Sequence, residues 1–183
     1  MKHKIYIHPF TIPLFVLAGM TNYGCRFYIL YLFILLHEIS HMTAGLILKE
    51  KVSAIKLMPW GCILCLSSIP KRKSTILIAL AGPVFNLVMF YMGIFPPENL
   101  SLALFNLIPV LPLDGGVIIN ALFTKGAFFI SSAFIVIICI LCIYFRLPLY
   151  LPIILAVLLI TGEKNRMDRN LSAKIIGYFK KES

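Results

Sequence analysis

The chain has 183 residues, of which 60% are hydrophobic and 13% are charged, and its mean hydropathy is +0.95. This composition is too apolar for a soluble domain and is typical of a polytopic membrane protein. The net charge of +10 does not indicate nucleic-acid binding, because that function needs a soluble basic face with exposed aromatic side chains.

Hydrophobic segments recur along the chain and are interpreted as membrane spans of an all-α polytopic protein with about six transmembrane helices. Their approximate bounds are 5–20, 27–48, 75–95, 100–123, 127–145 and 147–161. The first and last are short for a helix that must cross about 30 Å of hydrocarbon. Pro9 and Pro13 favour a tilted, irregular or partly re-entrant first segment. The sequence thus predicts one membrane domain over residues 1–162.

The basic residues predict the orientation of these spans. With six spans and both termini in the cytoplasm, every Lys and Arg except Arg26 and Arg146 lies on the cytoplasmic side, as the positive-inside rule requires. Residues 163–183 are basic, with apolar positions near helical spacing, and are interpreted as an amphipathic cytoplasmic tail on the membrane surface. No second folded domain is expected after the last span.

Residues 52–66, between the second and third spans, are neither a span nor a polar loop. Loosely alternating residues around Ile55 and Leu57, a turn signal at Pro59-Trp60-Gly61 and a second short apolar run predict a β-hairpin at the cytoplasmic side of the membrane. One interpretation is an interfacial loop anchored by Trp60. The other is an exposed strand edge that pairs with an extended peptide, with Ile55, Leu57, Pro59 and Trp60 as substrate-binding residues.

The run His37-Glu38-Ile39-Ser40-His41 lies inside the second apolar segment. Ionisable groups there are costly and indicate a functional site. On a helix, residues four apart lie one turn apart and roughly 40° round the axis, so both imidazoles can bind one metal ion. Glu38 lies off this line and is close enough to activate a water molecule as a general base.

The fourth segment holds the second concentration of polar and helix-breaking residues, from Asn106 to Gly116. Its prolines and glycines break the helix at membrane depth, where irregular backbone must be buried in protein or line a wet cavity. Asp114 is the only acidic residue besides Glu38 within a hydrophobic segment, and it falls at a depth similar to the two histidines. A catalytic zinc site needs three protein ligands and an open position, so Asp114 is the candidate third ligand.

Several alternatives stay open from the residues alone. Asn86 in the third segment is more typical of a helix–helix hydrogen bond than of a ligand, and the Cys62/Cys65 and Cys139/Cys142 pairs allow a four-thiolate zinc site. A membrane metal transporter could use the same His/Asp cluster, although it would need polar groups along a whole path. A catalytically inactive homologue is a further alternative, but every motif residue is present.

Three motifs in this order, HEISH, AGPVFN and NLIPVLPLDGG, resemble the site-2 protease family of intramembrane zinc metalloproteases. Within that family the chain is similar to the stage IV sporulation factor B group. The resemblance covers residues 27–120 and the six-span layout. Members of this group often carry a cytoplasmic CBS domain after the last span, and none is expected here.

The resemblance implies roles for individual residues. His37, His41 and Asp114 would bind one zinc ion per chain, with Glu38 as the general base and Asn106 positioning the substrate. Residues Gly82, Pro83 and Asn86 would support the core beside the site. The implied substrate is a membrane-associated protein, in the sporulation group a sigma-factor precursor, processed at the mother-cell membrane around the forespore. Membrane lipids and inhibitory membrane proteins are the implied partners.

Overall fold

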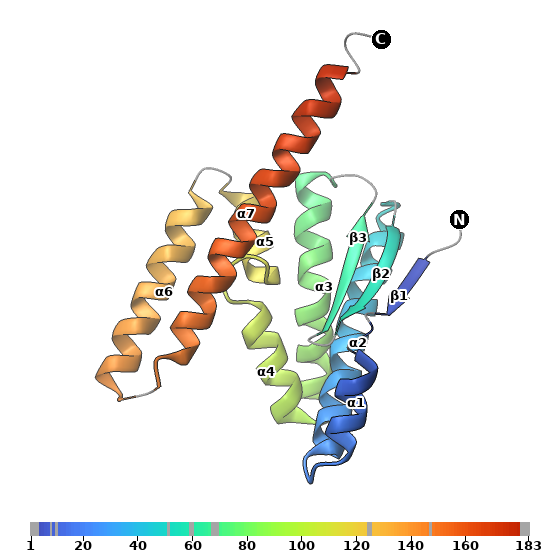
Figure 1. Cartoon of the computed structure of the whole chain (residues 1–183), viewed down its shortest axis with the longest axis vertical. Coiled ribbons are helices and arrows are strands. Elements are labelled where there is room, and N and C mark those ends of the chain that lie inside the picture. The colour runs from blue at the N-terminus through green and yellow to red at the C-terminus, as the bar shows by residue number, and fades with distance from the viewer. Residues whose placement is uncertain are drawn as a thin grey trace. The chain divides into compact units, whose positions relative to one another are not determined.

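The computed structural model describes residues 4–7, 9, 11–50, 52–58, 61–66, 70–123, 126–146 and 148–179. Side chains are not described in the strands or beyond residue 164. The chain forms two compact units, Met1–Leu107 and Ile108–Ser183, and each is considered by itself (Figure 1).

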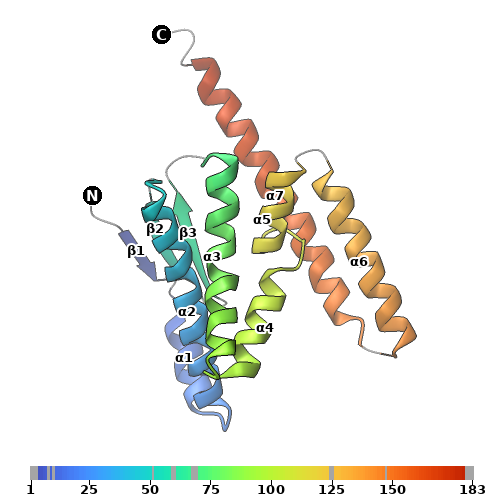
Figure 2. The same cartoon turned by 180° about the vertical axis from the view of Figure 1, so that it is seen from behind.

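Four helices build the first unit, and two of them form its centre. They are α1 (Thr11–Gly19), α2 (Gly24–Ile47), α3 (Arg72–Tyr91) and α4 (Pro96–Asn106). Helices α2 and α3 lie side by side, and α4 packs along α3 (Figures 1 and 2). The chain between α3 and α4 is short, which is typical of neighbouring antiparallel helices.

The buried faces of α2 and α3 follow from four-residue spacing. On α2 the buried residues include Phe33, His37, His41 and Gly45, and on α3 a matching line includes Ile78, Gly82 and Asn86. Residues four apart share one face of a helix. The two histidines are therefore held between two helices, while apolar residues elsewhere on α2, such as Leu32 and Ile47, are exposed.

A three-stranded sheet lies beside α2 in the first unit (Figure 1). Its strands are β1 (Lys4–Ile7), β2 (Val52–Met58) and β3 (Gly61–Leu66), in the order β1-β2-β3. Strand β2 pairs antiparallel with β3 and parallel with β1. The pair β2–β3 occupies the 52–66 segment, whereas β1 is a strand that the sequence did not predict. The position of the β2–β3 pair at the cytoplasmic side of the membrane stays a prediction.

The first hydrophobic segment does not form a single helix. Residues 5–20 divide into β1 and α1, and α1 has nine residues. At 1.5 Å per residue such a helix is about 13 Å long, too short to cross a bilayer. Pro9 lies between the two elements, where its lack of an N–H does least harm. The irregular form expected for this segment is the one observed, with a strand and a short helix in place of one long helix.

The second unit contains α5 (Asp114–Leu122), α6 (Ala127–Tyr144) and α7 (Tyr150–Phe179). Helices α6 and α7 run antiparallel, side by side (Figures 1 and 2). The predicted fourth segment is broken, because residues 107–113 between α4 and α5 are not helical. Helix α7 continues through residues 162 and 163, so the tail predicted from residue 163 begins inside a helix.

Within the described residues, three helices are long and apolar enough to cross a membrane: α2, α3 and α6. On α6, large apolar side chains such as Phe129, Val136 and Ile143 are exposed. Exposed apolar surface of this extent indicates contact with lipid in a membrane protein. The full set of six spans stays a prediction.

Candidate metal centre

The candidate site is built on the central turns of α2. His37 and His41 are 3% and 5% exposed, and their ring centroids lie 4.7 Å apart with an interplanar angle of 84°. Potential ligand atoms of His37, Glu38 and His41 all lie within 4.8 Å of one another. It is the one such group of His, Cys, Asp and Glu side chains found in the part of the chain that the structure describes. The helical spacing predicted from the sequence therefore brings these three side chains together.

Gly82 on α3 lies directly against the metal-binding edge of both imidazoles. A Cβ atom at this position would lie 2.5 Å from Nε2 of His37 and 2.5 Å from Nε2 of His41. Only glycine leaves room for the two nitrogens, because Cβ contacts below 3 Å require something to move. Both Nε2 atoms thus converge on the same small space beneath the α3 backbone.

The opposite ring nitrogens are held by oxygen acceptors from α3. Nδ1 of His41 lies 2.6 Å from the carbonyl oxygen of Ile78, and Nδ1 of His37 lies 3.4 Å from Oδ1 of Asn86. The carbonyl oxygen of Ile78 accepts but cannot donate, so Nδ1 of His41 carries the proton and its Nε2 keeps a lone pair. The direction of the longer His37–Asn86 hydrogen bond depends on the tautomer of His37. This arrangement prepares a histidine pair for metal binding through Nε2.

Ile78 supplies a main-chain carbonyl to His41 from within α3. In an α-helix this oxygen also faces the N–H of Gly82, four residues on. Pro83 has no N–H to donate to Ala79, so the carbonyl that proline leaves without a helical donor is that of Ala79 and not that of Ile78. The Gly-Pro-x-x-Asn pattern therefore supplies space at Gly82 and a side-chain partner at Asn86, while the Ile78 contact comes from the helix backbone.

Asn86 carries a polar atom that no described group satisfies. The residue is fully buried, its Oδ1 faces His37, and its Nδ2 has no hydrogen-bond partner among the described residues. Leaving a buried donor unpaired costs about 1–3 kcal/mol. The helix–helix hydrogen bond expected of Asn86 is therefore present between α3 and α2, and its partner on α2 is a candidate ligand.

The donor set fits zinc. Two imidazole nitrogens and carboxylate oxygen are typical ligands of catalytic zinc sites. Both histidines have their second nitrogen engaged, which orients the rings and raises their basicity. This chemistry, together with the space left by Gly82, makes the α2–α3 interface the candidate metal centre.

The remaining predicted site residues lie elsewhere along the chain. Asn106 is the last residue of α4, where its Nδ2 donates to the carbonyl oxygen of Leu102 at 3.1 Å. Asp114 is the first residue of α5, in the second unit, and is half-buried. Their roles beside the histidines stay predictions from the sequence. The contribution of Ile78 was missed, because a main-chain carbonyl has no residue-type signal in the sequence.

The predicted substrate-binding residues are only partly described. Pro59 and Trp60 lie outside the described residues, whereas Ile55 and Leu57 lie on β2. Strand β2 is central, because Ile55 is opposite Ile5 of β1 on one side and Leu64 of β3 on the other. The free backbone edges of the sheet therefore belong to β1 and β3, and an added peptide strand would pair with one of these.

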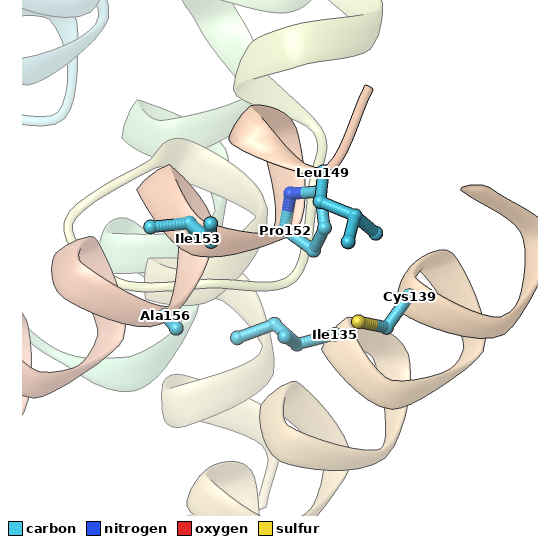
Figure 3. Close-up of a pocket in the computed structure, with 6 residues that line it drawn as sticks. All are labelled: Ile135, Cys139, Leu149, Pro152, Ile153 and Ala156. Atoms are coloured by element: carbon cyan, nitrogen blue, oxygen red, sulfur yellow. The ribbon is translucent and has the colours of Figure 1, made fainter. Parts of the chain in front are cut away.

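A groove lies between α6 and α7 in the second unit. Its volume is about 220 Å³, and Figure 3 shows Ile135 and Cys139 of α6 on one side with Pro152, Ile153 and Ala156 of α7 on the other. The lining is apolar apart from the thiol of Cys139, so the groove lacks the set of ligands that a catalytic metal site needs. Cys139 and Cys142 on α6 are free cysteines.

Comparisons with known proteins show which folds and sequences the chain resembles. No protein-family model matches the chain. The fold is that of a site-2 protease from Methanocaldococcus jannaschii, with a TM-score of 0.58, 23% sequence identity and coverage of 88% of this chain and 89% of that chain. The resemblance to the site-2 proteases, carried in the sequence by three motifs, thus extends to the fold.

Two curated relatives make the resemblance more specific. Stage IV sporulation protein FB of Bacillus subtilis is 26% identical over 139 residues, covering 67% of this chain and 48% of the relative. A zinc metalloprotease of M. jannaschii is 30% identical over 147 residues, covering 67% of this chain and 42% of the relative. The resemblance to the site-2 protease family, and within it to the sporulation factor B group, is confirmed. The matched region spans less than half the length of these curated relatives.

Proposed function

We propose that the chain is an intramembrane zinc metalloendopeptidase that hydrolyses a peptide bond of a membrane-associated protein within or near the bilayer. One observation carries this proposal. Nε2 of His37 and Nε2 of His41 converge beneath Gly82 while each Nδ1 is held by an oxygen acceptor, and Glu38 lies within 4.8 Å of both. Such an arrangement of two histidines supports metal binding, because core packing alone does not require both Nε2 atoms to converge while both Nδ1 atoms are hydrogen-bonded.

The proposed ligands are His37, His41 and Asp114, holding one zinc ion per chain. When bound, zinc polarises a carbonyl group and lowers the pKa of a coordinated water towards 7. The chain supplies two imidazoles from adjacent turns of α2 and one carboxylate from the start of α5. Three protein ligands leave a coordination position for the reacting groups.

Glu38 is the proposed general base and then the general acid. Its carboxylate takes a proton from the attacking water as the oxygen adds to the scissile carbonyl carbon, and then delivers that proton to the leaving amine nitrogen as the C–N bond breaks. Asn106 is proposed to donate a hydrogen bond from its amide to the carbonyl oxygen, where negative charge develops. The Nδ1 contacts from Asn86 and Ile78 keep both imidazoles oriented throughout.

The substrate is proposed to bind as an extended chain, because a helix hides the carbonyl groups that must be attacked. Strand addition at a free edge of the sheet would present such a chain through main-chain hydrogen bonds. Strand β3 is the favoured edge, since it packs on α2, the helix that carries the histidines. Ile55, Leu57, Pro59 and Trp60 are proposed to contact the substrate from the turn and the central strand.

The orientation proposed for the chain in the membrane is the one predicted from the positions of its basic residues. Both termini are proposed to be cytoplasmic, with residues 163–183 as a basic tail on the anionic leaflet. Membrane lipids are therefore partners of the chain, and inhibitory membrane proteins are proposed as regulators.

The proposed physiological substrate is a sporulation sigma-factor precursor, processed at the mother-cell membrane surrounding the forespore. Support comes from the similarity to a relative named stage IV sporulation protein FB. The alternatives are a site-2-type protease acting on another membrane-bound regulator and a membrane metal-binding or transport protein.

Co-expression with a sigma-factor precursor tests the substrate. Wild-type chain is expected to shorten the precursor, and Glu38→Gln is expected to leave it intact. Cleavage of other membrane-bound regulators but not of the precursor would favour the first alternative. Zinc-dependent metal flux into vesicles without any proteolysis would favour the transporter.

A further inference from the structure

The segment that precedes Asp114 is held in place by two helices of the second unit. Residues 108–113 are irregular backbone, yet Val110 is fully buried and Leu111 is 8% exposed. Two local hydrogen bonds, from Val110 N to Ile108 O and from Leu113 N to Val110 O, serve part of this backbone. Irregular backbone at membrane depth needs further support from the surrounding protein.

Ser131 of α6 provides one such support. Its side chain is 3% exposed, and its hydroxyl donates to the carbonyl oxygen of Pro109 at 2.5 Å. Proline at 109 lacks an N–H, so the segment is partly deprived of its own hydrogen bonds here. The hydroxyl therefore links the segment to a predicted membrane-spanning helix.

Gly162 of α7 provides the other support. A Cβ atom at this position would lie 2.6 Å from Leu111 Cβ and 2.9 Å from the Leu111 carbonyl carbon and oxygen. A second glycine, Gly116 of α5, also contacts this segment, and a Cβ atom there would overlap the backbone of Val110 and Leu111. The Leu111 backbone is therefore in close contact with two glycines from two different helices, and neither position accepts a larger residue without a shift of main-chain atoms.

We propose that Ser131 and Gly162 are positioning residues for the carboxylate of Asp114. Leu111 precedes Asp114 by three residues, and Leu113 is extended (φ −65°, ψ 159°) at the start of α5. A displacement of Leu111 is transmitted to Asp114 through the three rigid peptide units that join the two residues. The inference rests on the proposed function, in which Asp114 is a zinc ligand, and adds residues that lie in neither the His-Glu-x-x-His nor the Asp-Gly motif.

The test measures zinc affinity of the full chain in detergent by competition with a chelator, so it does not depend on proteolysis. Gly162→Ala and Ser131→Ala are expected to raise the apparent Kd for zinc by about 10- to 100-fold, the effect of losing support around a ligand. Ser131→Thr keeps the hydroxyl and is expected to retain wild-type affinity. Gly126→Ala is the matched control, because among the described residues the nearest contact of a Cβ atom there would be Phe123 Cβ at 3.9 Å.

The outcomes separate this inference from the proposed function. Wild-type zinc affinity in both Gly162→Ala and Ser131→Ala would overturn the inference, even if thermal stability fell, because the contacts would then be purely structural. If Gly162→Ala does not fold, the comparison of Ser131→Ala with Ser131→Thr decides alone. Asp114→Ala is measured in parallel. Loss of affinity there with none in the two positioning variants overturns only the inference, whereas an unchanged Kd in Asp114→Ala removes Asp114 from the ligand set and overturns both.

Discussion

Gly82 on α3 and His41 on α2 approach so closely that a single methyl group at residue 82 would lie 2.5 Å from the imidazole Nε2. The helix backbone thus forms one wall of the candidate metal centre. A side chain at this position would require both imidazoles to move.

The first prediction concerns this wall. Gly82→Ala is expected to abolish stoichiometric zinc binding, because the new Cβ displaces both imidazoles from their convergent geometry. Zinc content of the purified chain, measured by elemental analysis, checks this. Gly126→Ala adds the same methyl group at ordinary van der Waals distance from Phe123 Cβ, 3.9 Å. This variant is expected to bind zinc like wild type. Full zinc content in Gly82→Ala would show that the two Nε2 atoms are not the ligands.

The second prediction compares two fully buried asparagines. Asn86→Leu removes the acceptor for His37 Nδ1 and is expected to weaken zinc binding by about 10- to 100-fold. Asn86→Asp keeps an acceptor oxygen and is expected to bind zinc more tightly than Asn86→Leu. Chelator competition measures both.

Asn99 provides the control for this comparison. It is also fully buried, but its Nδ2 donates to Ile94 O and Phe95 O beside its own helix. Asn99→Leu is expected to lower thermal stability without changing zinc affinity. Equal losses of affinity in Asn86→Leu and Asn99→Leu would assign the effect to general destabilisation of α3 and α4.

The third prediction separates a general base from a ligand at Glu38. Glu38→Gln is expected to keep zinc and to lower the rate of peptide hydrolysis by about 10²- to 10⁴-fold, the usual contribution of acid–base catalysis. Zinc content and cleavage of a membrane-associated substrate are measured on the same preparation. Glu50→Gln, just beyond the end of α2, is the control and is expected to be fully active. Loss of zinc from Glu38→Gln would make Glu38 a ligand instead.

The local part of the site was predictable from sequence, because helical spacing alone brings His37 and His41 together. The hydrogen-bond acceptor for His41 could not be predicted, because a main-chain carbonyl such as that of Ile78 has no residue-type signal. Likewise, contact between Leu111 and Gly162 depends on helix packing between residues far apart along the chain. Local sequence patterns therefore predict which face of a helix carries the site, but they do not predict which residues of a neighbouring helix contact that face.

The fold shows the same division. The broken fourth segment was predictable from its prolines and glycines, and residues 107–113 are non-helical as expected. Strand β1 was not predictable, because the short stretch from Lys4 to Ile7 at the start of an apolar run has no pattern of its own. Its pairing with β2 is a long-range contact that only tertiary structure creates.

Metal-dependent hydrolysis by the purified chain tests the central claim most directly. A membrane-associated protein substrate is incubated with the full chain in detergent, after chelation and then after addition of zinc. The proposed function predicts cleavage that chelation abolishes and zinc restores in the wild-type chain, with none at any stage in Glu38→Gln. Cleavage that persists in the chelated chain, or that Glu38→Gln carries out at the wild-type rate, would contradict it.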